Sequence, residues 1–124
     1  SENFKNIHVL GRVDNVIDYL RICDYYISSS KGEGMPNAAL EALSCGLPAI
    51  LTDIEPHKEL VSTFNKSSIC YKEGMVDSLK VAIKTIINNN KSALSADARR
   101  VAIQEYDSKK MSIKYQNLYL ENIN

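Results

Sequence analysis

The 124-residue sequence has no excess charge of either sign, no long apolar run and only three cysteines. Lysine and arginine number 15, as do aspartate and glutamate, so the formal net charge is zero. This balance gives no support for a nucleic-acid-binding protein or for a polybasic membrane anchor. The longest apolar runs cover only a few residues, which predicts no direct membrane span. The first residues show no charged region followed by an apolar stretch, so no signal peptide is expected.

The cysteines indicate a reducing compartment. Cys23, Cys45 and Cys70 are odd in number, widely spaced and without a C-x-x-C pair. This pattern predicts buried thiols rather than a disulfide framework or a zinc site. We therefore expect a cytoplasmic protein.

What the sequence does contain is an alternation of short apolar runs with helical periodicity, in a chain without repeats or linkers. Strands are predicted at residues 7–10, 25–28, 49–51 and 68–71. Helices are predicted at residues 15–22, from Pro36 to just before Gly46, and at 55–61, 76–87, 95–106 and 108–123. The apolar side of the helix at 76–87 is expected to consist of Val76, Leu79, Ile83, Ile86 and Ile87. This order predicts an α/β fold, a Rossmann-like doubly wound parallel sheet with flanking helices and right-handed crossovers.

The predicted strand at 7–10 stands at the start of the chain, where a sheet of this kind usually has earlier strands. Residues 1–124 are therefore expected to form one domain that is a fragment of a longer protein.

The richest motif is the run from Ser28 to Pro48, in which Glu33 and Glu41 stand eight positions apart across the entry to a helix. In open α/β sheets, ligands bind beyond the carboxyl ends of the strands, where loops lead into helices. A helix that begins near Pro36 directs unpaired N–H groups and its positive dipole end at this loop, which favours an anion such as a diphosphate. Gly34 leaves room for a ligand to approach the backbone.

The two glutamates would bracket such a ligand. Glu41 lies five residues beyond Pro36, about 7 Å along the helix axis, and helical side chains lean toward the amino-terminal end. Its carboxylate could accept the hydroxyls of a ribose, and Glu33 could accept hydroxyls of a sugar on the other side of the diphosphate. The alternative is that both glutamates only stabilise the helix dipole, a contribution of a few tenths of a kcal/mol.

The run DYYISSSKGEGMPNAALEALSCGLPAILTD resembles the nucleotide-sugar-binding segment of the retaining GT-B glycosyltransferases of family 4, the glycosyl transferases group 1. The matching residues are Ser30, Glu33-Gly34, Pro36, Leu40-Glu41-Ala42 and Gly46-Leu47-Pro48. The upstream segment HVLGRVDNVIDYLRICDYYI resembles the family's approach to that motif, with Gly11 and Asp24 in register. The resemblance covers nearly the whole chain and implies the C-terminal, donor-binding half of a GT-B fold.

By this resemblance the chain would bind a UDP- or GDP-linked sugar for retaining transfer of a hexosyl group, without metal or other cofactor. Glu33, the implied catalytic residue, would hold the donor sugar, and Glu41 would hold the ribose. The backbone around Gly34, Met35, Pro36, Asn37 and Ala38 would face the sugar and the β-phosphate, next to Ser30. The loop of Gly11, Arg12 and Val13 would lie against the base.

The resemblance also implies partners outside this chain. A saccharide or lipid-linked acceptor would bind through a separate N-terminal domain, without which the chain would turn nothing over. Polysaccharide or glycolipid biosynthesis is the implied pathway, in the cytoplasm or at the inner face of the membrane. The family's phosphate-binding arginine and lysine come from an earlier loop that this chain lacks, and Arg12 and Lys31 are the nearest basic residues.

Two other functions fit the same fold: a non-catalytic nucleotide-sugar-binding module and a receiver-like signalling domain. A receiver needs an acidic pair after its first strand and a phosphorylatable aspartate after its third, and only Asp53 could serve. Asp53 is predicted to cap the segment that follows it. His57 also lies near the carboxyl end of a strand, where it either packs structurally or contacts a ligand or a partner domain.

Overall fold

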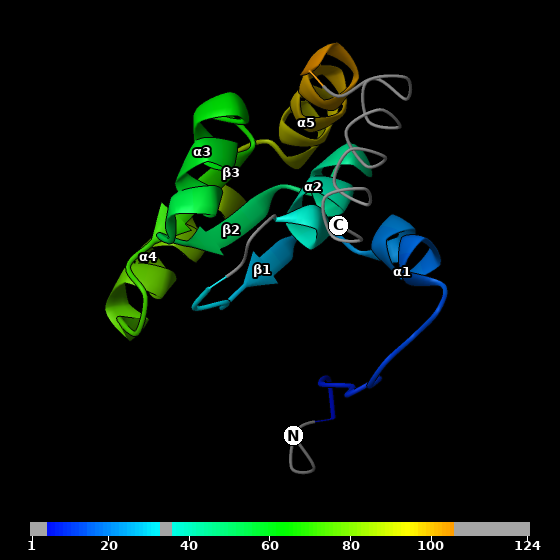
Figure 1. The fold of residues 1–124 in the computed structure, drawn as a ribbon, viewed down its shortest axis with the longest axis horizontal. Coiled ribbons are helices and arrows are strands. Elements are labelled where there is room, and N and C mark those ends of the chain that lie inside the picture. Colours follow the sequence, from blue (N-terminus) through cyan, green and yellow to red (C-terminus); the bar gives the residue numbers. More distant parts are fainter. Residues whose placement is uncertain (1–4, 33–35, 106–124) are drawn as a thin grey trace, which may run out of the picture.

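The computed structural model describes residues 5–32 and 36–105. In chain order the elements are α1 (Val16–Ile22), β1 (Tyr26–Ser28), α2 (Asn37–Ser44), β2 (Ala49–Thr52), α3 (Glu55–Thr63), β3 (Ser68–Tyr71), α4 (Val76–Ile87) and α5 (Lys91–Glu105). Figure 1 shows the strands side by side with helices around them. The predicted α/β class is confirmed.

The sheet is parallel throughout, in the order β1-β2-β3. Tyr26 pairs with Ala49, and Ala49 pairs with Ser68. All four residues of the central strand β2 are buried, because helices cover both of its faces. Its apolar run AIL, which precedes Thr52, is therefore the expected sequence of such a strand.

Two apolar cores lie on the two faces of this sheet. The larger core joins α2, α3 and α5 to the face of β2 that carries Ala49 and Leu51. The smaller core packs α4 and the first turn of α5 against Ile50 of β2 and Tyr71 of β3. Because alternate residues of one strand point to opposite faces, β2 contributes to both cores.

The predicted strand at 7–10 is wrong. No strand forms between residues 5 and 15, and Ile7, Val9 and Leu10 are exposed, Val9 by 78%. A parallel strand is stable only beside a hydrogen-bonded neighbour. Within the described residues no neighbouring strand is present for this segment, so its β-branched composition does not produce a strand.

Helix α2 ends in the manner that its sequence predicts. Gly46 adopts a left-handed conformation at φ 84°, its N–H donates to Leu43 O (2.9 Å), and the N–H of Leu47 donates to Ala42 O (3.0 Å). These two bonds form a Schellman motif. At the other end the helix begins one residue later than predicted, because Pro36 is the N-cap rather than the first helical residue.

Helices α4 and α5 differ from the prediction in detail. Ala82 and Ile86 are the buried residues of α4, whereas Val76 and Ile87, predicted on its apolar side, are 65% and 50% exposed. Helix α5 begins four residues early, because Asn90 caps it by accepting a bond from the N–H of Ala93 (3.0 Å). The predicted helix at 108–123 lies outside the described residues.

The cysteines are only partly as predicted. All three are free thiols, but Cys23 is exposed, and Cys45 and Cys70 are half-buried. The prediction of buried thiols is therefore wrong for Cys23, which follows a helix with no buried residue. Among residues 5–32 and 36–105, no helix combines the length and hydropathy needed to cross a bilayer.

Candidate functional site

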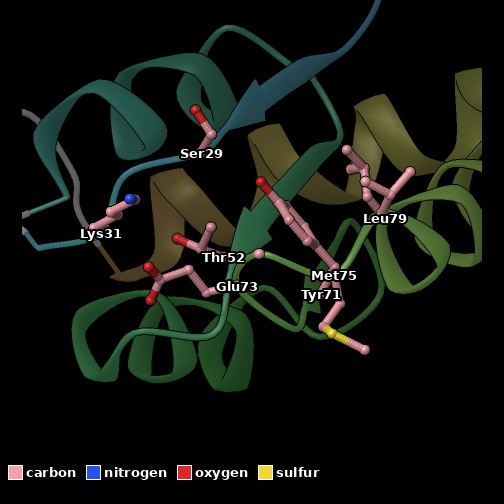
Figure 2. Close-up of a pocket in the computed structure, with 9 residues that line it drawn as sticks. Ser29, Lys31, Thr52, Tyr71, Glu73, Met75 and Leu79 are labelled. Atoms are coloured by element: carbon pink, nitrogen blue, oxygen red, sulfur yellow. The ribbon is translucent and has the colours of Figure 1, made fainter.

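The carboxyl ends of the three parallel strands lie at one edge of the sheet, and a pocket of about 320 Å³ opens there. Its lining comes from the loops after β1 and β3, from the end of β2 and from the start of α4. Figure 2 shows Lys31 and Glu73 at one end of this pocket, Leu79 at the other and Tyr71 between them. The position is the one at which open parallel sheets bind ligands.

Helix α2 starts at this edge and presents its amino-terminal end to the loop after β1 (Figure 1). The first intrahelical bond runs from the N–H of Leu40 to Pro36 O (2.9 Å), and no side chain of the described residues caps the helix. The N–H groups of Asn37, Ala38 and Ala39 therefore have no intrahelical acceptor. The side-chain oxygen of Asn37 is buried without a hydrogen-bond partner in the same part of the structure. Such an end suits an anionic ligand.

Glu41 lies on the second turn of the same helix. It is half-buried between Leu40 and Ala42, which are buried in the core. Within the described part of the chain its carboxylate makes no hydrogen bond or ion pair. A carboxylate without a partner, about one turn inside an uncapped helix end, can accept two ligand hydroxyls.

A chain of hydrogen bonds joins α3 and β2 to the loop after β1. The Thr52 hydroxyl donates to Ser30 O (2.6 Å), and His57 Nδ1 lies 3.0 Å from both the hydroxyl and the carbonyl oxygen of Thr52. His57 is 0% exposed and Thr52 is 1% exposed. His57 is therefore a buried structural residue, and the described structure gives it no surface for direct ligand contact.

Two further side chains at this edge bond to backbone groups of another strand or of a loop. The N–H of Glu73 donates to Asp53 Oδ1 (3.1 Å), and the Tyr71 hydroxyl donates to Ser28 O (3.1 Å). The prediction that Asp53 caps the next segment is wrong: the N-cap of α3 is Ile54, without a side-chain cap, because the carboxylate is engaged by the loop after β3.

Two groups at this edge have raised pKa values. Burial, and then the negative charge of Asp53, raise the pKa of the Cys70 thiol above 9.0, against a lowering influence of Lys58. Burial, and then Glu73, raise the pKa of the Tyr71 hydroxyl above 10.0. Both groups therefore stay protonated at neutral pH, and neither is an activated nucleophile or base.

The predicted site residues fall into three sets. Pro36, Asn37, Ala38 and Glu41 lie in α2 or at its N-cap, and Ser30 lies in the loop after β1, bonded to Thr52. Gly11, Arg12 and Val13 lie in the irregular segment before α1, which makes no backbone hydrogen bond to that junction within the described residues. Glu33, Gly34 and Met35 lie outside the described residues.

Thr52, Tyr71 and Glu73 also line the pocket at this edge, although they are not among the predicted site residues. The signal available for Thr52 and Tyr71 was their position, since each is a polar residue at the carboxyl end of a buried strand. Among the residues that the structure describes, no three His, Cys, Asp or Glu side chains gather as metal ligands.

Comparison with known proteins agrees with this architecture. The sequence matches the family described as Glycosyl transferases group 1 over residues 2–105. It is 38% identical over 64 residues to the capsular polysaccharide biosynthesis glycosyltransferase CapH of Staphylococcus aureus, covering 52% of this chain and 18% of that protein.

Two further relatives match almost the whole chain. One is the N,N'-diacetylbacillosaminyl-diphospho-undecaprenol alpha-1,3-N-acetylgalactosaminyltransferase of Campylobacter jejuni, at 28% identity over 91% of this chain and 30% of the relative. The other is the UDP-Gal:alpha-D-GlcNAc-diphosphoundecaprenol alpha-1,3-galactosyltransferase of Escherichia coli, at 24% identity over 96% of this chain and 31% of the relative. The chain thus spans less than a third of the length of these relatives.

The parallel sheet, with helices packed on both of its faces, defines a Rossmann-like α/β domain. The chain belongs to the glycosyl transferases group 1 family.

Proposed function

We propose that this chain is the C-terminal, donor-binding domain of a retaining GT-B glycosyltransferase of family 4. The observation that carries the proposal is Glu41, a carboxylate without a partner in the described structure, one turn inside the uncapped amino-terminal end of α2. An anion-binding helix end beside a hydroxyl acceptor suits one ligand class well, the nucleotide diphosphate sugars.

In this proposal the diphosphate lies on the N–H groups of Asn37 and Ala38, and Glu41 accepts the ribose hydroxyls. The helix end stabilises the charge that develops on the leaving diphosphate, as preorganised donors do in an oxyanion hole. Glu33 holds the donor sugar, with Gly34 and Met35 lining it. No metal or other cofactor is required.

The base is assigned to the segment of Gly11, Arg12 and Val13, in which the exposed Arg12 adds positive charge. This segment lacks a strand in the present structure, so the assignment requires it to settle against the α2 end when a nucleotide binds. The base is uracil or guanine, in a UDP- or GDP-linked donor.

The acceptor belongs to the rest of the enzyme. The relatives' names contain diphospho-undecaprenol acceptors and a capsular polysaccharide, which supports a saccharide or lipid-linked acceptor for this protein. We place that acceptor on a separate N-terminal domain, in the cytoplasm or at the inner face of the membrane. The isolated chain then binds a hexosyl donor and transfers nothing.

The test is a titration of the complete gene product with UDP, GDP, UDP-N-acetylglucosamine, UDP-galactose and GDP-mannose. Wild-type protein should bind one nucleotide series. Glu41→Ala should lose about tenfold or more in affinity for the nucleotide alone, because a hydrogen bond to a charged group contributes about 1.5–3 kcal/mol. Glu33→Ala should lose affinity mainly for the sugar-bearing ligand.

Glu59→Ala is the matched control, because Glu59 is an exposed glutamate on α3. It should bind every ligand as the wild type does. If no ligand of the series binds to folded wild-type protein, the donor-binding proposal is wrong. If UDP or GDP binds equally well to the Glu41→Ala and Glu33→Ala proteins, the two roles are wrongly assigned.

A further inference from the structure

We infer that His57 is a positioning residue: acting through Thr52, it holds the backbone at Ser30 and so sets the loop that leads from β1 into the donor site. The positioning of the loop is inferred from the hydrogen bonds of the described residues. Its effect on donor binding rests on the proposed function.

Ser30 lies beyond the end of the sheet. The β1–β2 ladder ends at the pair Ser28 and Leu51, and Ser30 lies two residues further along the chain. At that point the Thr52 hydroxyl donates to the carbonyl oxygen of Ser30 at 2.6 Å. A side chain of β2 thus extends the contact between the two strands into the loop.

The donors and acceptors of these hydrogen bonds follow from their chemistry. The Thr52 hydroxyl has one hydrogen, and Ser30 O can only accept, so that hydrogen points to Ser30. The same hydroxyl oxygen must then accept from His57. The carbonyl oxygen of Thr52, also 3.0 Å from His57 Nδ1, can only accept as well. Both contacts require the hydrogen of the imidazole to be on Nδ1.

These hydrogen bonds lie in the interior of the protein. His57 and Thr52 are almost completely shielded from water, at 0% and 1% exposure. Water therefore cannot replace His57 as the donor, and removal of the imidazole takes away the donor to the Thr52 hydroxyl oxygen, whereas the Thr52 carbonyl oxygen still accepts from the Cys70 thiol (3.6 Å). The orientation of the Thr52 hydroxyl toward Ser30 consequently depends on His57.

The consequence for binding is selective. Glu41 and the N–H groups of α2 belong to a helix packed in the core, and they do not depend on this chain of bonds. The loop after β1 does depend on it, at Ser30 and, one residue later, at Lys31 in the pocket wall. Loss of these hydrogen bonds should therefore weaken binding of the sugar end of a donor and leave binding of the nucleotide end unchanged.

Two matched pairs of variants test this in the complete gene product. His57→Asn retains an N–H donor near the position of Nδ1, and His57→Leu fills similar space without it. Thr52→Ser retains the hydroxyl, and Thr52→Val removes it at nearly constant volume. The probes are UDP, GDP, UDP-N-acetylglucosamine, UDP-galactose and GDP-mannose, and the measured quantity is the ratio of nucleotide-sugar affinity to nucleotide affinity.

The His57→Leu and Thr52→Val proteins should bind the nucleotide within about twofold of wild type and the nucleotide-sugar about tenfold more weakly, the effect of one hydrogen bond. In the His57→Asn and Thr52→Ser proteins, the ratio of nucleotide-sugar affinity to nucleotide affinity should return most of the way to the wild-type value. The ¹⁵N spectrum of wild-type His57 should show the hydrogen on Nδ1, and the Ser30 and Lys31 amide signals should shift in the two deficient variants.

An equal loss for both ligands, or no loss, would overturn the positioning role and leave the donor-binding proposal intact. A hydrogen on Nε2 alone would also overturn it. Failure of wild-type protein to bind any probe would defeat the proposed function, and this inference with it. If His57→Leu does not fold, the Thr52 pair decides the question alone.

Discussion

At the scale of single residues, side chains at the edge of the sheet bond to backbone groups of another strand or of a loop. Tyr71 bonds to Ser28 O and Asp53 bonds to the N–H of Glu73. Each of these side chains stands at or just beyond the end of its strand. The loops around the pocket are thus fixed by a few specific bonds, each of which can be removed by one substitution.

Tyr71 offers the first prediction at this scale. Its hydroxyl pKa is raised above 10.0 by burial and then by Glu73, so the folded state retains the proton more strongly than the unfolded state does. The stabilisation is complete below the unfolded-state pKa, about 10, and is lost as the pH rises through the folded-state pKa. Urea unfolding should show the free energy of unfolding falling as the pH rises from about 9 to about 11.

Tyr71→Phe is the control for this alkaline loss. It should cost about 1 kcal/mol at a pH of about 8, because one hydrogen bond to Ser28 is gone. It should also show a shallower fall at alkaline pH. Equal slopes for the two proteins would mean that other groups, among them Cys70 with its raised pKa, account for the alkaline loss.

At the scale of elements, the carboxyl end of α2 depends on Gly46 in two ways. Its φ of 84° is strained for any residue with a Cβ, and a Cβ built there would lie 2.6 Å from Arg99 Nε of α5. The guanidinium of Arg99 lies against the end of α2, with Nη2 3.5 Å from Cys45 O. The glycine therefore permits both the turn and the close approach of α5.

Gly46→Ala should lower the free energy of unfolding by about 1–2 kcal/mol from the backbone conformation alone. Displacement of Arg99 adds to this cost. Gly74→Ala separates the two contributions, because Gly74 has a similar φ of 75° and an alanine Cβ there would meet no described atom within 4 Å. Thermal unfolding should rank the proteins as wild type, Gly74→Ala and Gly46→Ala. A reversed order of the two variants would contradict the role of the Arg99 contact.

The elements also show what sequence could and could not predict. The apolar runs of β2 and β3, and the glycine stop of α2, follow from local chemistry and were predicted to within a residue. The segment 7–10 has equally suitable residues but no neighbouring strand in the described structure, and pairing is a property of two segments rather than one. In the same way, the bonds of Asp53 and Thr52 join positions about 20 apart, which no local pattern encodes.

The candidate site was predictable in part for the same reason. Glu41 and the start of α2 belong to one short run of sequence, so spacing alone placed them together. The involvement of His57 with Ser30 requires β1 and β2 to be neighbours, which the α/β alternation predicts only in outline. The chain of bonds between them became visible only in three dimensions.

At the scale of the whole molecule, the two cores share the central strand. Ile50 packs against α4, while Leu51 packs against α2, α3 and α5. The faces of the edge strand β1 are less well covered, and Ile27 is 50% exposed. Stability is therefore distributed unevenly across the sheet.

Ile50→Ala should lower the free energy of unfolding by about 2–5 kcal/mol, the cost of a buried isoleucine truncation. Ile27→Ala makes the same chemical change at a half-exposed position and should cost about 1 kcal/mol or less. Urea unfolding monitored by circular dichroism gives both values. Similar losses for the two proteins would show that the surface of Ile27 is covered in solution.

The register of the sheet has a consequence for the kinetics of folding. Tyr26 of β1 is 23 residues from its partner Ala49 in the sequence, and Ala49 is 19 residues from its partner Ser68. Neither of these strand pairs can therefore form as a hairpin, and each must close a long loop, helix included, before any ladder bond forms. The entropic cost of closing a loop grows slowly with its length, so the two strand pairings have similar closure costs. Because both ladders of the described sheet share β2 and both are non-local, we expect folding at the slower pace of α/β topologies rather than that of a helical bundle.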